Sequence, residues 1–247
     1  MAIAFDAATT SSESKTATLT FSHTVGVGEN RLIVVGIFAV NNSKTNLVSC
    51  ASVTYNGVSM TKARADQIVG SGNYSAESSL WILANPASGA HNVVATITNY
   101  FTHAGVSVSY TGCAQVSTPD AVNGKTGTAY GSQTFDVTTV ADNCWVVAIG
   151  GVDCNAYGAT FVASDTSRGT LNIYDGYDRV RMQDTNGAVT PAGARTIGFT
   201  LSNSNIIGFA MTGASIAPVA AASDPEGSLI GGKLIRGGLL LHGVLGR

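Results

Sequence analysis

Charged side chains are scarce in this sequence. Asp, Glu, Lys and Arg make up only 11% of its 247 residues, against a usual share of about 25%. The 13 basic and 15 acidic residues leave a formal net charge of −2. A protein that holds nucleic acid electrostatically normally carries a basic field, so we expect no nucleic-acid partner.

Long apolar runs are missing as well. No window of about 18 uninterrupted apolar residues occurs, so we expect no membrane-spanning helix and no membrane partner. Residues 1–15 contain no basic segment followed by an apolar one, which argues against a Sec signal peptide. These absences predict a protein that is made in a host cytoplasm.

Catalytic sequence motifs are absent too. The chain has no Gly-x-Ser-x-Gly elbow and no His-x-x-x-His or Cys-x-x-Cys pair. Its histidines are scattered, and we expect them to be surface or interface side chains rather than metal ligands. We therefore expect a non-enzymatic protein that needs no cofactor.

The densest group of charged residues offers one candidate metal site. Asp175, Asp178 and Asp184 lie close together in the sequence, and Ca²⁺ prefers several carboxylate oxygens. Arg179 and Arg181 could neutralise the same carboxylates, and the spacing is not that of an EF-hand. We favour the interpretation that this stretch holds no metal.

Cysteine usage bears on the redox environment. In a protein without a signal peptide, buried free thiols are favoured over disulfides, although the even number of cysteines leaves disulfides open. Cys144 lies within an apolar run, where it should pack as a small hydrophobic side chain. The four cysteines are Cys50, Cys113, Cys144 and Cys154.

What the sequence does contain predicts an all-β fold. Glycine is plentiful, with 29 residues, and no stretch has a useful helical period. The run Asn30–Val40 is almost continuously β-branched and aliphatic, and Asn143–Ile149 is a second run of the same kind. Each run predicts a central strand that is buried on both faces, or nearly so.

Weaker patterns surround the first central run. Lys15–Val25 alternates apolar and polar residues, which predicts a half-buried strand. Asn56 and Gly57 stand between two short alternating arms and predict a hairpin, because both residues accept positive φ. Thr61–Ser79 is polar and rich in Gly and Ser, so we expect a long loop or an irregular edge there.

The second half of the sequence repeats the plan of the first. Asn30 and Asn143 introduce the two central runs and are 113 positions apart, whereas Gly89 and Gly193 lie in similar turns 104 apart. The closing segments VSVSYTG and IGFAMTG agree at an offset of 101. Blocks that recur in the same order predict an internal repeat of about residues 15–112 and 128–214.

These patterns together predict an antiparallel β-sandwich of jelly-roll type over residues 1–218, built from two sequence-similar halves. Two tandem sandwiches are the alternative, but we favour one double-sheet body to which both halves give strands. Residues 219–228 then predict a linker of small residues and Pro. Residues 229–247 predict an extended, apolar, Gly-rich C-terminal arm.

The predicted arm cannot bury its own aliphatic side chains, so it implies a docking surface. That surface could belong to the same body, to a sister subunit or to another protein. We expect the arm to mediate assembly. The side chains concerned are Leu229, Ile230, Leu234, Ile235, Leu239, Leu240, Leu241, Val244 and Leu245.

Three tyrosines are candidates for binding a glycan. Tyr74, Tyr174 and Tyr177 lie in stretches rich in Gly, Asp and Ser, where exposed rings could stack on sugars. Trp81 and Trp145 lie in apolar strands, where we expect core packing instead. A carbohydrate-binding module for a cell-surface glycan is therefore one functional hypothesis.

Four sequence blocks resemble a β-sandwich module that recurs in tailed-phage structural proteins and in some bacterial surface proteins: NRLIVVGI, VTYNGVSM, LWILANPASGAHNVVATI and VSVSYTG. The resemblance covers roughly residues 15–218. It consists of strand and turn patterns, so it implies a fold and transfers no functional residue. It implies a head decoration or appendage protein of a virion, with capsid or tail proteins and further copies of itself as partners. A non-enzymatic virion structural protein is therefore our leading hypothesis.

Overall fold

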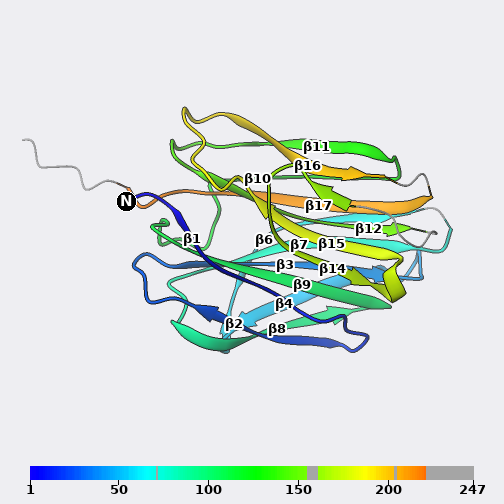
Figure 1. The fold of residues 1–247 in the computed structure, drawn as a ribbon. Helices are drawn as coiled ribbons and strands as arrows, with labels where there is room; N and C mark the ends of the chain where they lie inside the picture. Colours follow the sequence, from blue (N-terminus) through cyan, green and yellow to red (C-terminus); the bar gives the residue numbers. More distant parts are fainter. Residues whose placement is uncertain (71, 155–160, 203–204, 221–247) are drawn as a thin grey trace, which may run out of the picture.

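Figure 1 shows the computed structural model, which describes residues 1–70, 72–154, 161–202 and 205–220. Within these residues the fold is all-β, as predicted, with antiparallel strands and one short 3₁₀ helix, η1. No helix of the described part is long and apolar enough to cross a bilayer. The elements are β1 (Ala4–Thr10), β2 (Thr18–Val25), β3 (Leu32–Asn41), β4 (Ser49–Tyr55), β5 (Val58–Ser59), β6 (Thr61–Val69), β7 (Ser75–Ala84), β8 (Gly89–Thr98), β9 (Thr102–Thr111), β10 (Ala121–Gly127), β11 (Gly131–Thr138), β12 (Trp145–Cys154), β13 (Phe161–Ala163), β14 (Thr166–Ile173), η1 (Tyr174–Gly176), β15 (Asp178–Asp184), β16 (Ala194–Leu201) and β17 (Ile206–Ile216).

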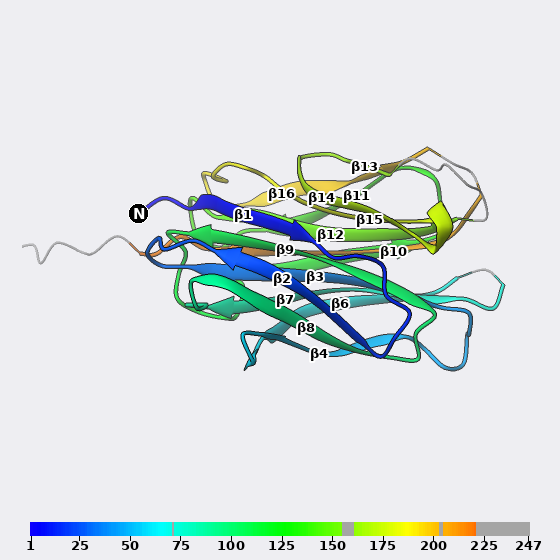
Figure 2. The same ribbon diagram turned by 60° about the horizontal axis from the view of Figure 1, so that its bottom comes forward.

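The strands form four sheets that stack as layers (Figures 1 and 2). Through the stack their orders are β2-β8-β4-β5, β1-β9-β3-β7-β6, β10-β17-β12-β15-β14 and β11-β16-β13. Strands β1–β9 form the first two layers, called the first half, and β10–β17 form the other two, called the second half. The two five-stranded sheets face each other across a shared apolar core. This interface is called the seam below.

The strands do not interleave between the halves, as the expected double-sheet body would require. Every ladder between named strands joins strands of the same half, so each half forms its own sandwich. The physical reason lies in β3 and β12, which are buried along both faces. One face packs against the outer sheet of its own half and the other packs against the opposite half. Four layers therefore bury apolar surface that two separate sandwiches would leave in water.

Both halves use the same strand order. The first central sheet contains β9-β3-β7, and the second contains β17-β12-β15 in the corresponding places. Asn30 and Asn143 adopt positive φ values of 53° and 64° shortly before β3 and β12. These equivalences support the hypothesis that the chain contains an internal repeat.

Alternating side chains on the central strands separate three apolar cores. On β3, Ile33 and Val35 face the core of the first half, whereas Val34 and Phe38 face the seam. β12 alternates in the same way between the core of the second half and the seam. A strand with two buried faces needs an almost continuous apolar run, so both predicted central strands are confirmed.

Two reciprocal contacts between β3 and β12 close the seam. A Cβ at Gly36 would overlap the side chain of Ile149, and a Cβ at Gly151 would overlap the ring of Phe38. Each glycine thus leaves the space that a bulky side chain of the other half fills. Gly36 and Ile149 are 113 positions apart, and so are Phe38 and Gly151. In the predicted repeat, each contact therefore joins two equivalent positions.

Of the two alternatives predicted for Thr61–Ser79, the irregular edge agrees with β6, which lies at the edge of its sheet and has a register shift between Lys62 and Arg64. The long loop is wrong for the stretch from Ser75, which forms the buried start of β7. Its polar residues resemble a loop in the sequence, but several are buried and hydrogen-bonded. Glu77 Oε1 accepts a bond of 2.9 Å from the Cys50 amide, and the Ser78 hydroxyl donates to the Ile149 carbonyl at 3.3 Å. Buried polar groups with such partners are compatible with a strand.

Other local predictions are confirmed. Asn56 and Gly57 both have positive φ and form the turn between β4 and β5. Trp81 and Trp145 are only 4% and 8% exposed. All four cysteines are free and buried.

The predicted arm, residues 229–247, lies outside the described residues together with all nine of its aliphatic side chains, Leu229 to Leu245. Residues 221–228 of the predicted linker lie outside them as well. The assembly role of the arm therefore stays a prediction.

The interlocked glycines predict a stability effect. Gly36→Ala and Gly151→Ala should each lower the free energy of unfolding by about 1–3 kcal/mol, because the added methyl group displaces Ile149 or Phe38 from the seam. Chemical denaturation followed by fluorescence measures this effect. The matched control is Gly193→Ala, because a Cβ at Gly193 meets no atom within 4 Å.

Trimming the opposing side chain should restore part of the loss. The double variant Gly36→Ala with Ile149→Val should be more stable than the sum of the two single changes predicts. If Gly36→Ala lowers the free energy of unfolding no more than Gly193→Ala does, the close approach of β3 and β12 is not what holds the halves together.

Candidate functional site

The strongest candidate for a functional surface is a group of three rings, Phe101, Tyr174 and Tyr177, called the aromatic cluster below. Phe101 lies between β8 and β9 in the first half, whereas the two tyrosines lie at η1 in the second half. The Phe101 and Tyr174 rings meet edge to face with centroids 4.8 Å apart, and the Tyr174 and Tyr177 centroids are 5.5 Å apart. All three residues are partly exposed. The structure thus brings two of the predicted glycan contacts together and adds Phe101.

A charged pair borders the aromatic cluster. Lys15 Nζ lies 6.0 Å from the ring centroids of both Phe101 and Tyr174, which is within range of a cation–π interaction. Glu13 Oε1 lies 3.4 Å from Lys15 Nζ and accepts a hydrogen bond of 2.7 Å from the Thr102 hydroxyl. Burial would raise the pKa of Glu13, but these hydrogen bonds and the lysine charge lower it overall. An ionised acceptor therefore stands beside the rings at neutral pH.

The backbone at η1 positions the two tyrosines. Tyr174 adopts a φ of 50°, which is uncommon for an aromatic residue, and Gly176 adopts a φ of 92°. The Tyr177 amide donates to the Tyr174 carbonyl at 2.9 Å, and the Arg179 guanidinium donates to the Gly176 carbonyl. These bonds hold a tight turn that sets the two rings side by side. Aromatic rings with a neighbouring acceptor and ammonium can stack on a sugar and bind its hydroxyls.

Tyr74 does not belong to this surface, so this part of the predicted glycan site is wrong. Its side chain is 3% exposed and contributes to the core of the seam. The ring packs against Gly70 and Gly208, because a Cβ on Gly70 would overlap it and one on Gly208 would press against it. The expected loop is in fact the hairpin of β6 and β7, which turns Tyr74 towards the second half.

The aspartates that suggested a calcium site are not gathered together. Asp178 and Asp184 lie at opposite ends of β15, and the side chain of Asp175 is outside the described structure. Asp184 binds Arg168 through two bonds of 2.7 and 2.8 Å and accepts a bond of 2.8 Å from the Tyr110 hydroxyl. Among the described residues, no three His, Cys, Asp or Glu side chains group at metal-binding distance.

One group contains the residue types of a hydrolase triad in an arrangement that cannot act as one. His23 Nε2 lies 3.0 Å from Ser109 Oγ, and the Ser109 hydroxyl donates to Asp6 Oδ2 at 2.7 Å. The serine proton therefore points to the aspartate, so the histidine must donate to the serine and cannot take its proton. Ser109 is also fully buried. This network instead ties β1, β2 and β9 together.

The free thiols are also unsuited to nucleophilic chemistry. Burial raises the pKa of Cys50, Cys113 and Cys154 to about 12 in each case. A cysteine nucleophile acts as the thiolate, which these side chains do not form at neutral pH. These three thiols therefore pack as small side chains in the apolar cores. Cys144 is not among them, because its thiol donates to Asp120 Oδ2 at 3.3 Å.

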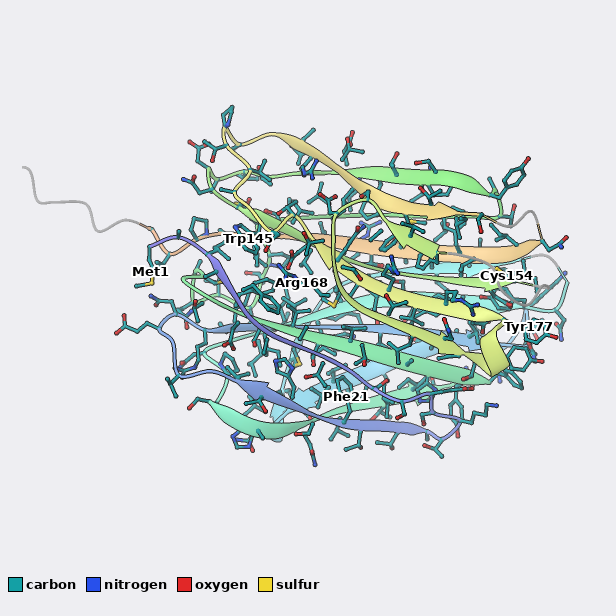
Figure 3. All side chains as sticks on the ribbon, viewed as in Figure 1. Met1, Phe21, Trp145, Cys154, Arg168 and Tyr177 are labelled. Atoms are coloured by element: carbon teal, nitrogen blue, oxygen red, sulfur yellow. The ribbon has the colours of Figure 1, made fainter. Side chains whose placement is uncertain are left out.

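The largest hollow that we describe has a volume of about 700 Å³ and lies far from the aromatic cluster. Met1–Ile3, Trp145 and Pro218–Ala220 are among the residues that line it. Figure 3 shows Met1 and Tyr177 at opposite ends of the body. The two ends of the molecule therefore offer different surfaces.

The chain matches no protein-family model and no curated protein. Its functional interpretation therefore rests on its own geometry.

Sequence reasoning missed three parts of these sites: Phe101, the His23 network and a buried pair of carboxyl groups, Asp153 and Asp178. Phe101 and Tyr174 belong to different halves, and only the packing at the seam brings them into contact. His23 occupies an alternating strand and is 86 positions from Ser109. No local pattern in the sequence signals either contact.

Buried histidines predict how stability depends on pH. Burial lowers the pKa of His23 and of His103 from 6.5 to about 4. Below pH 6.5 these histidines bind protons in the unfolded chain but not in the folded chain, so their contribution to stability should fall as the pH drops from 6.5 towards 4. The raised pKa values of the buried Glu77, Asp153 and Asp178 act in the opposite direction, so the histidine contribution is isolated by comparing variants. Each histidine can contribute a loss of at most about 3 kcal/mol. Denaturation at a series of pH values measures the slope.

The variant His103→Leu isolates one of these contributions. Both ring nitrogens of His103 lack a hydrogen-bond partner among the described residues, so leucine should cost little at pH 7 and should flatten the acid side of the profile. His91→Leu is the control, because its ring is partly exposed and should leave the slope unchanged. An unchanged slope in His103→Leu would contradict the assignment.

Proposed function

We propose that the protein is a non-enzymatic structural component of a phage virion, of head decoration or appendage type. It is anchored or oligomerised through its C-terminal arm, and its partners are capsid or tail proteins and copies of itself. The observation that supports this proposal best is the different character of the two ends of the body.

The described chain stops at Ala220, at one end of the body. Pro218–Ala220 share a hollow with Met1–Ile3, and Tyr177 with the aromatic cluster lies at the opposite end (Figure 3). A body that is held through its arm would therefore present the aromatic cluster away from the point of attachment.

The composition of the body also fits a structural role. Three buried cores stabilise the four layers, and the scarce charges leave a weak electrostatic field. Within the described residues, the groups that resemble catalytic machinery serve packing and hydrogen bonding. The proposal therefore assigns no reaction to the protein.

Deleting residues 227–247 tests the anchor. The truncated protein should stay folded and soluble, because the described strands all precede the deletion, but it should lose the oligomeric state of the full chain. Each buried aliphatic side chain of the arm contributes roughly 1.5–3 kcal/mol before ordering costs. Light scattering coupled to size-exclusion chromatography measures the assembly state, and circular dichroism checks the fold.

A substitution variant separates the arm's chemistry from its length. Changing Leu239, Leu240 and Leu241 to Ser keeps the chain length and should reproduce the loss of assembly. A truncated protein that retains the parent's assembly state removes the anchor hypothesis. A truncated protein that fails to fold shows instead that the arm belongs to the core of its own body.

The aromatic cluster supports a second candidate function, recognition of a host-surface glycan. Tyr174 and Tyr177 lie side by side, with Phe101 packed edge to face against Tyr174 and the Glu13–Lys15 pair at the border. This role is compatible with the first, because a displayed virion protein can also bind a glycan.

Removing the two tyrosine rings tests this second function. Tyr174→Ala with Tyr177→Ala should weaken binding to bacterial surface polysaccharides about tenfold or more on a glycan array, which corresponds to about 1.4 kcal/mol. Tyr130→Ala is the matched control, since Tyr130 is 64% exposed and lies outside the cluster. Equal losses in both variants, or no glycan bound by the unchanged protein, would exclude the site.

A further inference from the structure

A buried pair of carboxyl groups lies in the second half, close to η1. Asp153 near the end of β12 is 7% exposed, and Asp178 at the start of β15 is 1% exposed. Val152 pairs with Arg179 in the ladder of β12 and β15, so Asp153 and Asp178 come next in that register and share one face of the sheet. No described group donates a hydrogen bond to either side-chain oxygen of Asp178. In Figure 3, Cys154 and Tyr177, the chain neighbours of this pair, lie at the same end of the body.

A third oxygen atom from the other half joins the pair. The hydroxyl of Tyr74 is buried and has no hydrogen-bond partner among the described residues. Asp153 pairs with Gly208 in the ladder of β12 and β17, and a Cβ at Gly208 would lie 3.2 Å from the Tyr74 ring, so the ring lies beside Asp153 on that face. Gly70 and Gly208 fix the ring, since a side chain at either position would meet it. A buried hydroxyl without a partner is costly, so the Tyr74 hydroxyl is a candidate to contact a ligand.

At the opposite end of β15, other side chains match the charge of the buried carboxylate Asp184 and donate hydrogen bonds to it. Asp184 is held by the guanidinium of Arg168 and by the hydroxyl of Tyr110. At the Asp178 end, the Arg179 guanidinium donates instead to the backbone carbonyls of Gly176 and Asp178. Within the described part of the chain, the carboxyl pair therefore has hydrogen-bond acceptors in excess and forms no ion pair.

We propose that Asp153, Asp178 and the Tyr74 hydroxyl are the protein ligands of a site for a hard divalent cation, Ca²⁺ or Mg²⁺. All three groups offer oxygen, which these ions prefer, and a cation supplies the positive charge that the pair lacks. The Cys154 sulfur packs in the core of the second half, so the site offers no soft ligand. Water would supply the remaining ligands.

The site would also hold the two halves together. Asp153 and Asp178 come from the central sheet of the second half, whereas Tyr74 comes from the hairpin of β6 and β7 in the first. A cation between them would link the halves at the end of the seam that has no ion pair of the Arg168–Asp184 kind. This role is independent of the virion and glycan proposals.

Thermal unfolding of the full chain tests the site. After removal of metal with EDTA, millimolar Ca²⁺ or Mg²⁺ should raise the Tm by about 5 °C. Asp178→Asn should abolish this shift, and Tyr74→Phe should reduce it. Asp136→Asn, on an exposed strand position of the outer sheet, is the control and should keep the full shift. Tb³⁺ luminescence sensitised by tyrosine should follow the same order among the variants.

Two outcomes overturn the proposal. The first is that neither cation changes the Tm and Tb³⁺ gives no sensitised emission, which leaves Asp153 and Asp178 as a pair that shares one proton. The second is that Asp178→Asn keeps the shift of the unchanged protein, so that the cation binds elsewhere. Asp153→Asn provides the same comparison if Asp178→Asn does not fold.

Discussion

The contact of β3 with β12 across the seam is the constraint on which the rest of the structure depends. Each central sheet is apolar on both faces, so neither sandwich alone keeps its own surface from water. Gly36 makes room for Ile149, and Gly151 makes room for Phe38. In the predicted repeat each contact joins equivalent positions, so two identical halves would place either two glycines or two bulky side chains opposite each other. Close packing instead requires a glycine opposite a bulky side chain, so the two halves must differ at these positions.

Buried carboxyl groups lie at both ends of the seam, and the two ends differ in whether a positively charged side chain binds them. Arg168 and Tyr110 satisfy Asp184, so a buried carboxylate is stable at that end of β15. Asp153 and Asp178 lie at the other end, where neither side-chain oxygen of Asp178 has a hydrogen-bond partner among the described residues. A buried carboxylate without a positive partner is strongly destabilising, so the pair must share a proton or bind a cation. Side chains of the protein thus neutralise the carboxylate at one end of the seam, whereas the pair at the other end takes up a proton or a cation from solution.

The same stacking that builds the seam also builds the aromatic cluster. Phe101 is fixed by the turn before β9, and Tyr174 by the tight turn at η1, so the rings meet only because the two halves pack against each other. This surface lies far from Pro218–Ala220, where the described chain ends. The two functional proposals assign attachment to the end where the described chain stops and contact to the end that carries the aromatic cluster.

The sequence by itself determined what depends on neighbours along the chain: the two central strands, the Asn56–Gly57 turn, the buried tryptophans and the free thiols. Period-two alternation shows which residues share a face, and an uninterrupted apolar run shows that both faces are covered. Neither pattern says which sheet provides the cover. For that reason the double-sheet body, the exposed Tyr74 and a loop over Ser75–Ser79 were predicted wrongly, and Phe101, Ser109 and Asp153 were not connected to their partners. Only the tertiary structure decided these contacts, because the fit of one sheet against another depends on the shapes of side chains that are far apart in the sequence.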